Sequence, residues 1–207
     1  MEILTSIKAW QEWRNTIEPE KSVGLVPTMG ALHAGHQSLI ARCRRENDIC
    51  TISLFVNPTQ FNDQSDLANY PSTFDADRAL CEAEGVDAIF FPQYSELYPD
   101  NYRYRVTENE ESRLLCGAHR PGHFDGVLSV VMKLLNLARP RHAYFGEKDW
   151  QQLQLVKGMV EAFFMPVTIV PCPTVREDDQ LALSSRNVRL SPAHRQKAAG
   201  FPRLLAT

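Results

Sequence analysis

The most informative segment of this chain reads Val26-Pro27-Thr28-Met29-Gly30-Ala31-Leu32-His33-Ala34-Gly35-His36. The short apolar run at 23–26 suits a buried strand, and Pro27 and Gly30 end it. From about His36 onward, the apolar residues repeat with a helical period. The segment therefore predicts a strand end, a tight turn and a helix that opens on two histidines.

Such a segment can hold a phosphate group. The N-terminus of a helix offers free backbone N–H groups and the positive end of the helix dipole. The imidazoles of His33 and His36 add donors at the same place, and Gly35 between them leaves room for a ligand near the backbone. A histidine at a helix start is also a common cap or solvated side chain, so both interpretations stay open for this segment alone.

Length and composition indicate one sizeable hydrophobic core. The chain has 207 residues and a formal net charge of −3, with acidic and basic residues well mixed. No nucleic-acid partner, membrane span or secretion signal is indicated. The five cysteines form no C-x-x-C pair, which argues against a disulfide framework or a zinc site and favours a reducing cytoplasm.

Predicted strands and helices alternate along the chain. Further strands are expected at 49–56, 86–91, 142–145 and 167–170, and helices at 7–17, 72–85, 124–138, between the last two strands, and from 191 to 200. Ser72 is expected to cap its helix and Gly85 to end it. The alternating segment Tyr102–Val106 is expected to form an edge strand or part of a hairpin. This order predicts an α/β fold with a Rossmann-like, mostly parallel sheet and helices on both faces.

Ligands of such folds bind at the carboxyl ends of the strands. The loops expected to converge there are 27–35, 57–62, 146–149 and 174–187. In the second loop, Gln60 offers a donor and an acceptor to a small acid. In the third, Lys148 is a point charge for a phosphate, and Asp149 can cap a helix or accept from a ribose hydroxyl. Gln152 lies one turn further along, facing the same edge.

The last of these loops carries two hydroxyls and a guanidinium, from Ser184, Ser185 and Arg186. A mobile loop with these groups can close on a triphosphate and neutralise a leaving pyrophosphate. Taken singly, each of the polar loop residues has a simpler interpretation as a cap or a solvated side chain. Their expected convergence on one edge is what favours a site.

The sequence lacks the motifs that mark several other enzyme classes. The chain has no G-x-x-x-x-G-K-[ST], no G-x-G-x-x-G and no G-x-S-x-G. His33 and His36 do not form H-E-x-x-H, so a zinc hydrolase is disfavoured.

Five stretches together resemble one known family. They are PTMGALHAGH (27–36), FVNPTQFN (55–62), RPGHFDGV (120–127), FGEKDWQQL (145–153) and LSSRN (183–187). In this combination and order the chain resembles the pantothenate synthetase family, the pantoate–β-alanine ligases. The His33-Ala34-Gly35-His36 motif alone would indicate only the wider nucleotidyltransferase superfamily with the HxGH motif.

The resemblance implies a two-step ligase reaction. ATP adenylates the carboxylate of pantoate with release of pyrophosphate, and the amine of β-alanine then attacks the acyl adenylate and expels AMP. It implies that Gln60 and Gln152 bind pantoate, with Gln60 also near β-alanine, and that Asp77 is a metal-side acid for Mg²⁺. Ala76 occupies a neighbouring position where some members of the family have an acid.

The resemblance also assigns nucleotide and catalytic positions. The implied catalytic residues are His36, as general acid, with His33, Lys148, Ser184, Ser185 and Arg186. The implied ATP-binding residues are Met29, Gly30, Ala31, Leu32, His33, Ala34, Gly35, His36, Gly146, Glu147, Lys148, Asp149, Val175, Leu183, Ser184, Ser185 and Arg186. Gln180 and Leu183 depart from the Gly and Met that the family usually shows.

The resemblance implies two units and a homodimer. Residues 1–174 are expected to form the nucleotide- and pantoate-binding domain, and 175–207 a loop that closes on ATP and the start of a C-terminal domain that is largely missing. The segment Tyr102–Val106 is an expected contributor to the dimer. The alternatives are a catalytically weak nucleotide-binding domain, or another nucleotidyltransferase, against which Gln60 and Gln152 argue because they suit a small acid.

Overall fold

The six strands found within residues 1–205 lie in one parallel sheet, in the order β1-β4-β3-β2-β5-β6. The structure is a computed structural model and describes residues 1–205. The strands are β1 Glu2–Leu4, β2 Val23–Thr28, β3 Ile49–Leu54, β4 Ala88–Phe90, β5 His142–Gly146 and β6 Thr168–Cys172. The predicted α/β sheet is confirmed, and β1 is a short strand that the sequence interpretation missed.

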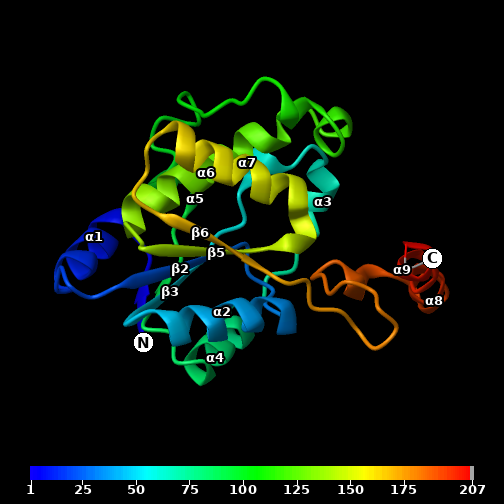
Figure 1. Ribbon diagram of the computed structural model, residues 1–207, viewed down its shortest axis with the longest axis horizontal. Helices are drawn as coiled ribbons and strands as arrows, with labels where there is room; N and C mark the ends of the chain where they lie inside the picture. The colour runs from blue at the N-terminus through cyan, green and yellow to red at the C-terminus, as the bar shows by residue number, and fades with distance from the viewer. Residues whose placement is uncertain (206–207) are drawn as a thin grey trace.

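Helices cover both faces of this sheet. The helices within residues 1–205 are α1 Ile7–Asn15, α2 Ala34–Glu46, α3 Gln64–Ala68, α4 Phe74–Ala83, α5 Tyr94–Leu97, α6 His123–Ala138, α7 Trp150–Ala162, α8 Pro192–Ala198 and α9 Gly200–Leu205. Short 3₁₀ turns are η1 Pro58–Gln60, η2 Glu111–Arg113, η3 Gly117–His119, η4 Glu147–Asp149 and η5 Asn187–Arg189. Figure 1 shows α6 and α7 above the sheet and α2 and α4 below it.

The two-residue period of the strands divides the core into two clusters. Leu25 packs with Trp10 of α1 and Leu128 of α6 on one face. The next residue, Val26, packs with Ile40 of α2 on the other face. Successive side chains of a strand point to opposite faces, so a strand buried on both sides needs a continuous apolar run.

Two local predictions were wrong for identifiable reasons. Helix α4 begins at Phe74 with Thr73 at its N-cap position, so Ser72 does not cap it. The segment Tyr102–Val106 is not a strand, because Tyr102 has a left-handed φ of 63° and the N–H of Tyr104 bonds to Asp100 Oδ2 at 2.8 Å. A side-chain acceptor has thus replaced a ladder partner. The predicted end of α4 is confirmed, because Gly85 follows it with φ 71°.

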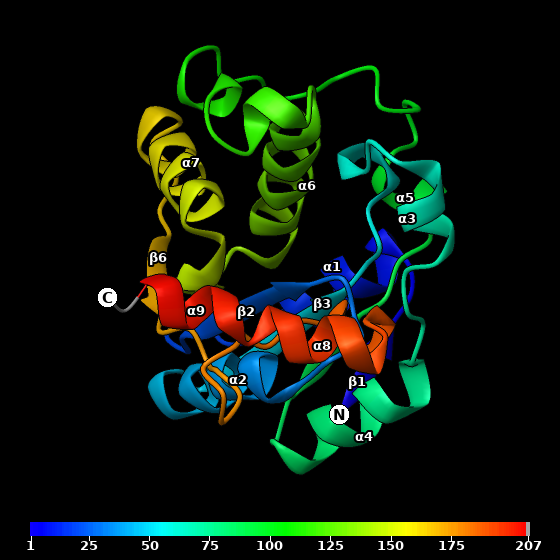
Figure 2. The same cartoon turned by 90° about the vertical axis from the view of Figure 1, so that its right-hand side faces the viewer.

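The strand order places a crevice beside β2. The chain runs outward from β2 to β3 and β4, then crosses back so that β5 lies on the other side of β2. Loops that leave β2 and β5 therefore diverge, which is the usual place for a ligand in a doubly wound sheet. After β6, residues 173–191 return toward this edge. Helices α8 and α9 stand apart from the sheet in Figure 1, and Figure 2, viewed from their side, shows them in front of it. No helix within residues 1–205 has the length and apolar character needed to cross a membrane.

Candidate active site

A pair of histidines opens α2 at the carboxyl end of β2. His33 is the N-cap residue, and its Nδ1 accepts from the N–H of Gly35 at 3.1 Å. His36 Nδ1 accepts in turn from the N–H of His33 at 3.3 Å. The two rings lie 4.1 Å apart between centroids. Because both Nδ1 atoms accept, each neutral ring carries its proton on Nε2, which is the atom left to donate to a ligand.

The absence of a side chain at Gly35 makes this arrangement fit. A Cβ there would lie 2.8 Å from Cε1 of the His33 ring, closer than real Cβ contacts. Gly35 therefore makes room for the imidazole that caps its own helix. This is a different use from the close ligand approach expected from the sequence.

The electrostatics keep both imidazoles neutral in the free protein. Burial, followed by the neighbouring charges of His33 and Lys148, lowers the pKa of His36 to about 3. Burial and the charge of Lys148 also lower the pKa of His33. Desolvation and nearby positive charge both disfavour the imidazolium form. The rings therefore meet a ligand as N–H donors, beside a lysine that supplies the positive charge.

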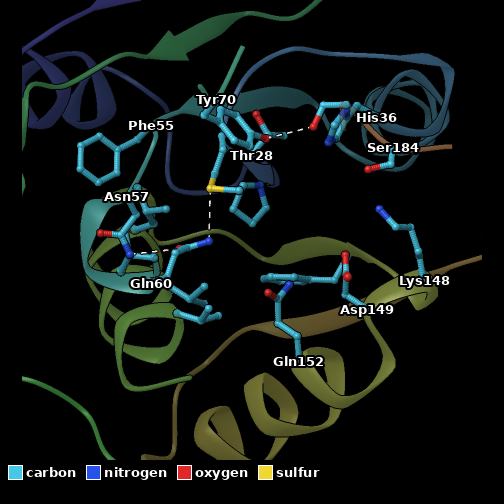
Figure 3. A pocket seen from close by; sticks show the side chains of 18 of the residues that line it. Thr28, His36, Phe55, Asn57, Gln60, Tyr70, Lys148, Asp149, Gln152 and Ser184 are labelled. Atoms are coloured by element: carbon cyan, nitrogen blue, oxygen red, sulfur yellow. Dashed lines mark hydrogen bonds between the residues drawn. The ribbon is translucent and has the colours of Figure 1, made fainter. Parts of the chain in front are cut away.

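Two adjoining cavities open beside the histidines, with volumes of about 200 and 130 Å³. Figure 3 shows His36, Ser184 and Lys148 at one end of the larger cavity and Asn57 and Gln60 at the other. The larger cavity is lined by the predicted residues Met29, His33, His36, Gln60, Lys148, Asp149, Gln152, Ser184, Ser185 and Arg186. The smaller adds Gly35, Gly146, Val175 and Leu183. Neither cavity is lined by Gly30, Ala31, Leu32, Ala34 or Glu147.

The end of the cavity near Gln60 has an apolar wall. Its side chains come mainly from α6 and from the ends of β3 and β5: Phe55, Val127, Val130, Val131, Leu134 and Phe145. Polar groups fixed among apolar side chains are typical of a site for a small molecule. The wall is a feature that the sequence interpretation did not include in the site.

Hydrogen bonds hold both the side-chain amide and the backbone oxygen of Gln60. Its Oε1 accepts from Asn57 Nδ2 at 3.0 Å, and its Nε2 donates to Met29 Sδ at 3.2 Å. Its backbone oxygen accepts from Nδ1 of His123 at 2.8 Å, which leaves Nε2 of that ring to accept from Arg120 at 3.1 Å. Gln60 is therefore prepositioned by Met29, a predicted site residue, and by Asn57 and His123, which were not predicted.

The loop that carries Ser184, Ser185 and Arg186, here called the phosphate-side loop, is held by α3 and by the residues that follow it. Tyr70 Oη lies 3.2 Å from Ser185 Oγ, and Arg186 forms an ion pair with Asp66 at 2.8 Å. A second arginine, Arg189, pairs with the same carboxylate at 2.6 Å. Hydrogen bonding to Arg186 leads the contributions that lower the pKa of Asp66 to about 2. The loop predicted to be mobile is thus fastened to the opposite wall of the crevice.

The carboxylate of Asp77, the predicted metal-side acid, accepts hydrogen bonds beside the turn before α2. Its Oδ2 accepts from the N–H of Ala31 at 2.9 Å, and its Oδ1 from the N–H of Leu32 at 2.8 Å and from Thr73 Oγ1 at 3.2 Å. It is buried and lines neither of the two cavities. No group of three or more His, Cys, Asp or Glu side chains within residues 1–205 is placed to hold a metal ion. This geometry gives Asp77 the role of fixing the turn before α2.

One further placement differs in detail from expectation. Asp149 occupies the N-cap position of α7, but its side chain makes no capping hydrogen bond, so its carboxylate remains available to the cavity. The residues missed by sequence interpretation are Asn57, Asp66, Tyr70, Arg120 and His123. Of these, Asn57 lies in the quoted stretch 55–62, and Arg120 and His123 lie in the quoted stretch 120–127, which is the signal that could have marked them.

Comparison with known proteins gives one consistent result. The family model for pantoate-beta-alanine ligase matches residues 2–207. The pantothenate synthetase of Bdellovibrio bacteriovorus is 62% identical over 197 residues, covering 95% of this chain and 78% of the relative. That of Legionella pneumophila is 52% identical over 204 residues, covering 99% and 81%. A crystal structure of the pantoate-beta-alanine ligase from Francisella tularensis, complexed with beta-gamma ATP and beta-alanine, superposes with a TM-score of 0.97 at 41% identity, covering 100% of this chain and 80% of that one.

Proposed function

The chain belongs to the pantoate-beta-alanine ligase family, and from this premise we propose how its residues divide the ATP-dependent condensation of pantoate with β-alanine. The observation that carries the proposal is the continuity of the larger cavity. The start of α2 with its two histidines lies at one end, and a prepositioned amide with an apolar wall lies at the other. A triphosphate and a small branched acid can therefore meet between them.

In the first step, a pantoate carboxylate oxygen attacks the α-phosphorus of ATP, and pyrophosphate leaves with the electrons of the broken P–O bond. We assign the Nε2–H groups of His33 and His36 to the phosphate oxygens on which negative charge grows. Fixed donors of this kind stabilise a transition state most where water is excluded. Lys148 and Arg186 supply positive charge toward the leaving pyrophosphate. The general-acid role of His36 stays a prediction, because the free site holds the neutral ring.

Pantoate is assigned to the opposite end. Gln60 and Gln152 offer amide groups to its hydroxyls and carboxylate, and the valines of α6 take its methyl groups. In the second step, the amine of β-alanine forms a C–N bond to the acyl carbon, and AMP leaves with the electrons of the acyl C–O bond. The attacking nitrogen, which enters as a neutral NH2 group, gives up one of its two protons to water or to the AMP phosphate and keeps the other as the amide N–H.

We also propose a metal ion for the nucleotide, a location for the protein and a state of assembly. Mg²⁺ is proposed as a companion of the triphosphate, held by phosphate oxygens. A cytoplasmic location agrees with five cysteines that are all unpaired within the described residues. The homodimer and the division at 174/175 rest on the family resemblance alone, and light scattering of the purified chain would test the dimer.

One assay tests the reaction. AMP and pyrophosphate are measured with ATP, pantoate and β-alanine present, and with each omitted in turn. Pyrophosphate release that needs ATP and pantoate, followed by AMP release that needs β-alanine, supports the proposal. ATP binding without pyrophosphate release would identify a non-catalytic nucleotide-binding domain. Adenylation of a different acceptor would identify another nucleotidyltransferase.

A further inference from the structure

The contact between α3 and the phosphate-side loop spans the crevice. Helix α3 follows the loop that carries Gln60, whereas Arg186 follows β6. We propose that Asp66 is a positioning residue for ATP, which fixes the guanidinium of Arg186 at the phosphate end of the cavity. The inference rests on the proposed function of the cavity, and it assigns a role to a residue that lies outside the cavity lining.

The geometry leaves one edge of the guanidinium free for a ligand. Asp66 Oδ1 accepts from Nε of Arg186 at 3.2 Å, and Oδ2 accepts from Nη2 at 2.8 Å. This side-on pair fixes the plane of the guanidinium through two parallel hydrogen bonds. Within the described part of the chain, Nη1 has no hydrogen-bond partner, and Arg186 lines the larger cavity. Nη1 is therefore the group offered to a phosphate oxygen.

Two aromatic rings lie against the guanidinium of Arg186. The guanidinium carbon lies 5.3 Å from the ring centroid of Tyr70 and 5.9 Å from that of Phe61. Arg189 shares the Asp66 carboxylate at 2.6 Å, so one acid orders two arginines. Ordering a long side chain costs conformational entropy. Here that cost is met before the nucleotide arrives, and preorganisation of this kind strengthens binding.

The expected consequence falls on ATP rather than on pantoate. Asp66→Asn keeps the size of the side chain and removes its charge. Without the carboxylate, Arg186 must be ordered by the nucleotide itself. We expect the Kd for ATP to rise about five- to tenfold, which is the effect of losing one or two partly exposed ion pairs. The KM for ATP should rise by the same factor, with the KM for pantoate within about twofold.

Asp63→Asn is the matched control. Asp63 caps the same helix by accepting from the N–H of Ser65 at 2.7 Å, and within residues 1–205 it has no ion pair or hydrogen bond with Arg186. Asparagine caps as well as aspartate, so the control loses the same charge and keeps the helix. Asp66→Glu restores a carboxylate and should recover at least half of the lost ATP affinity, which a merely structural loss would not predict.

The decisive test is the effect of Asp66→Asn in an Arg186→Ala background, with ATP binding measured by calorimetry. If Asp66 acts through Arg186, the second substitution adds less than about twofold, because interacting residues are not additive. Three results would each overturn the inference. They are a full effect of Asp66→Asn in the Arg186→Ala background, equal effects of Asp66→Asn and Asp63→Asn, and tighter ATP binding by Asp66→Asn. Absence of ATP binding by the wild-type chain would instead refute the proposed function.

Discussion

Gly126 sets the distance between α6 and the turn that carries Gln60. A Cβ built at Gly126 would lie 2.4 Å from the carbonyl oxygen of Thr59 and 2.7 Å from the backbone nitrogen of Gln60. Both neighbours are backbone atoms, which cannot rotate away as a side chain can. We therefore predict that Gly126→Ala displaces η1 and impairs pantoate binding.

The structure sets the size of this effect. Ordinary contact begins near 3.4 Å, so the distance must widen by about 1 Å. Overpacking of this kind costs about 1–3 kcal/mol of unfolding free energy. A misplacement of about 1 Å at a substrate-positioning group can lower activity by about a hundredfold. We expect pantoate affinity to fall at least tenfold and ATP affinity to stay within about twofold.

Gly158→Ala is the control, because Gly158 lies within α7 and a Cβ there meets nothing within 4 Å. It gains the helix propensity of alanine, about 1 kcal/mol, without a clash. Its melting temperature should therefore rise by about 2–4 °C, whereas that of Gly126→Ala should fall. Calorimetric titration with pantoate and thermal melting measure the two effects. If both variants melt alike and bind pantoate alike, the close approach does not position Gln60.

Three further substitutions test the site and the turn before α2. His36→Gln should lower pyrophosphate release about a hundred- to a thousandfold. Burial lowers the pKa of His36 in the folded protein to about 3, so between pH 6.5 and 3 the unfolded chain binds more protons than the folded one. The unfolding free energy of the wild type should therefore decline from pH 6.5 toward 3 more than that of His36→Gln, as measured by urea unfolding. Gln152→Ala should weaken pantoate binding by about 1.5–3 kcal/mol, and an equal loss for ATP would show that it holds the loops instead. Asp77→Asn should lower the unfolding free energy by about 1–3 kcal/mol, and a shifted Mg²⁺ dependence would contradict its structural role.

The parts of the fold that sequence could predict are those determined locally. The turn from β2 into α2 is encoded by neighbours in sequence, and the histidine that caps α2 lies within it. The convergence of four loops followed from parallel strands, whose carboxyl ends share one edge. Tyr102–Val106 failed because alternation does not reveal that Asp100 supplies the acceptor for Tyr104.

The remaining site residues depend on contacts between distant segments. Gln60 is predictable as a polar loop residue, but His123, which bonds to its carbonyl oxygen, is 63 residues away in sequence. Asp66 and Arg186 are 120 residues apart, and nothing near either residue specifies the partner. Such pairings require the crossover of the chain to be known first.

The join between β2 and β5 has a consequence for how the protein folds. Only Gly24 with His142 and Leu25 with Ala143 are in register across it, and these partners are more than a hundred residues apart. Closing so long a loop is entropically unfavourable and slow, so this seam forms late in folding. The larger cavity lies across the pairing of β2 with β5, so it cannot form before these two strands have paired. Recovery of ATP binding during refolding should consequently lag behind recovery of helix content, and a bound nucleotide should slow the opening of the seam.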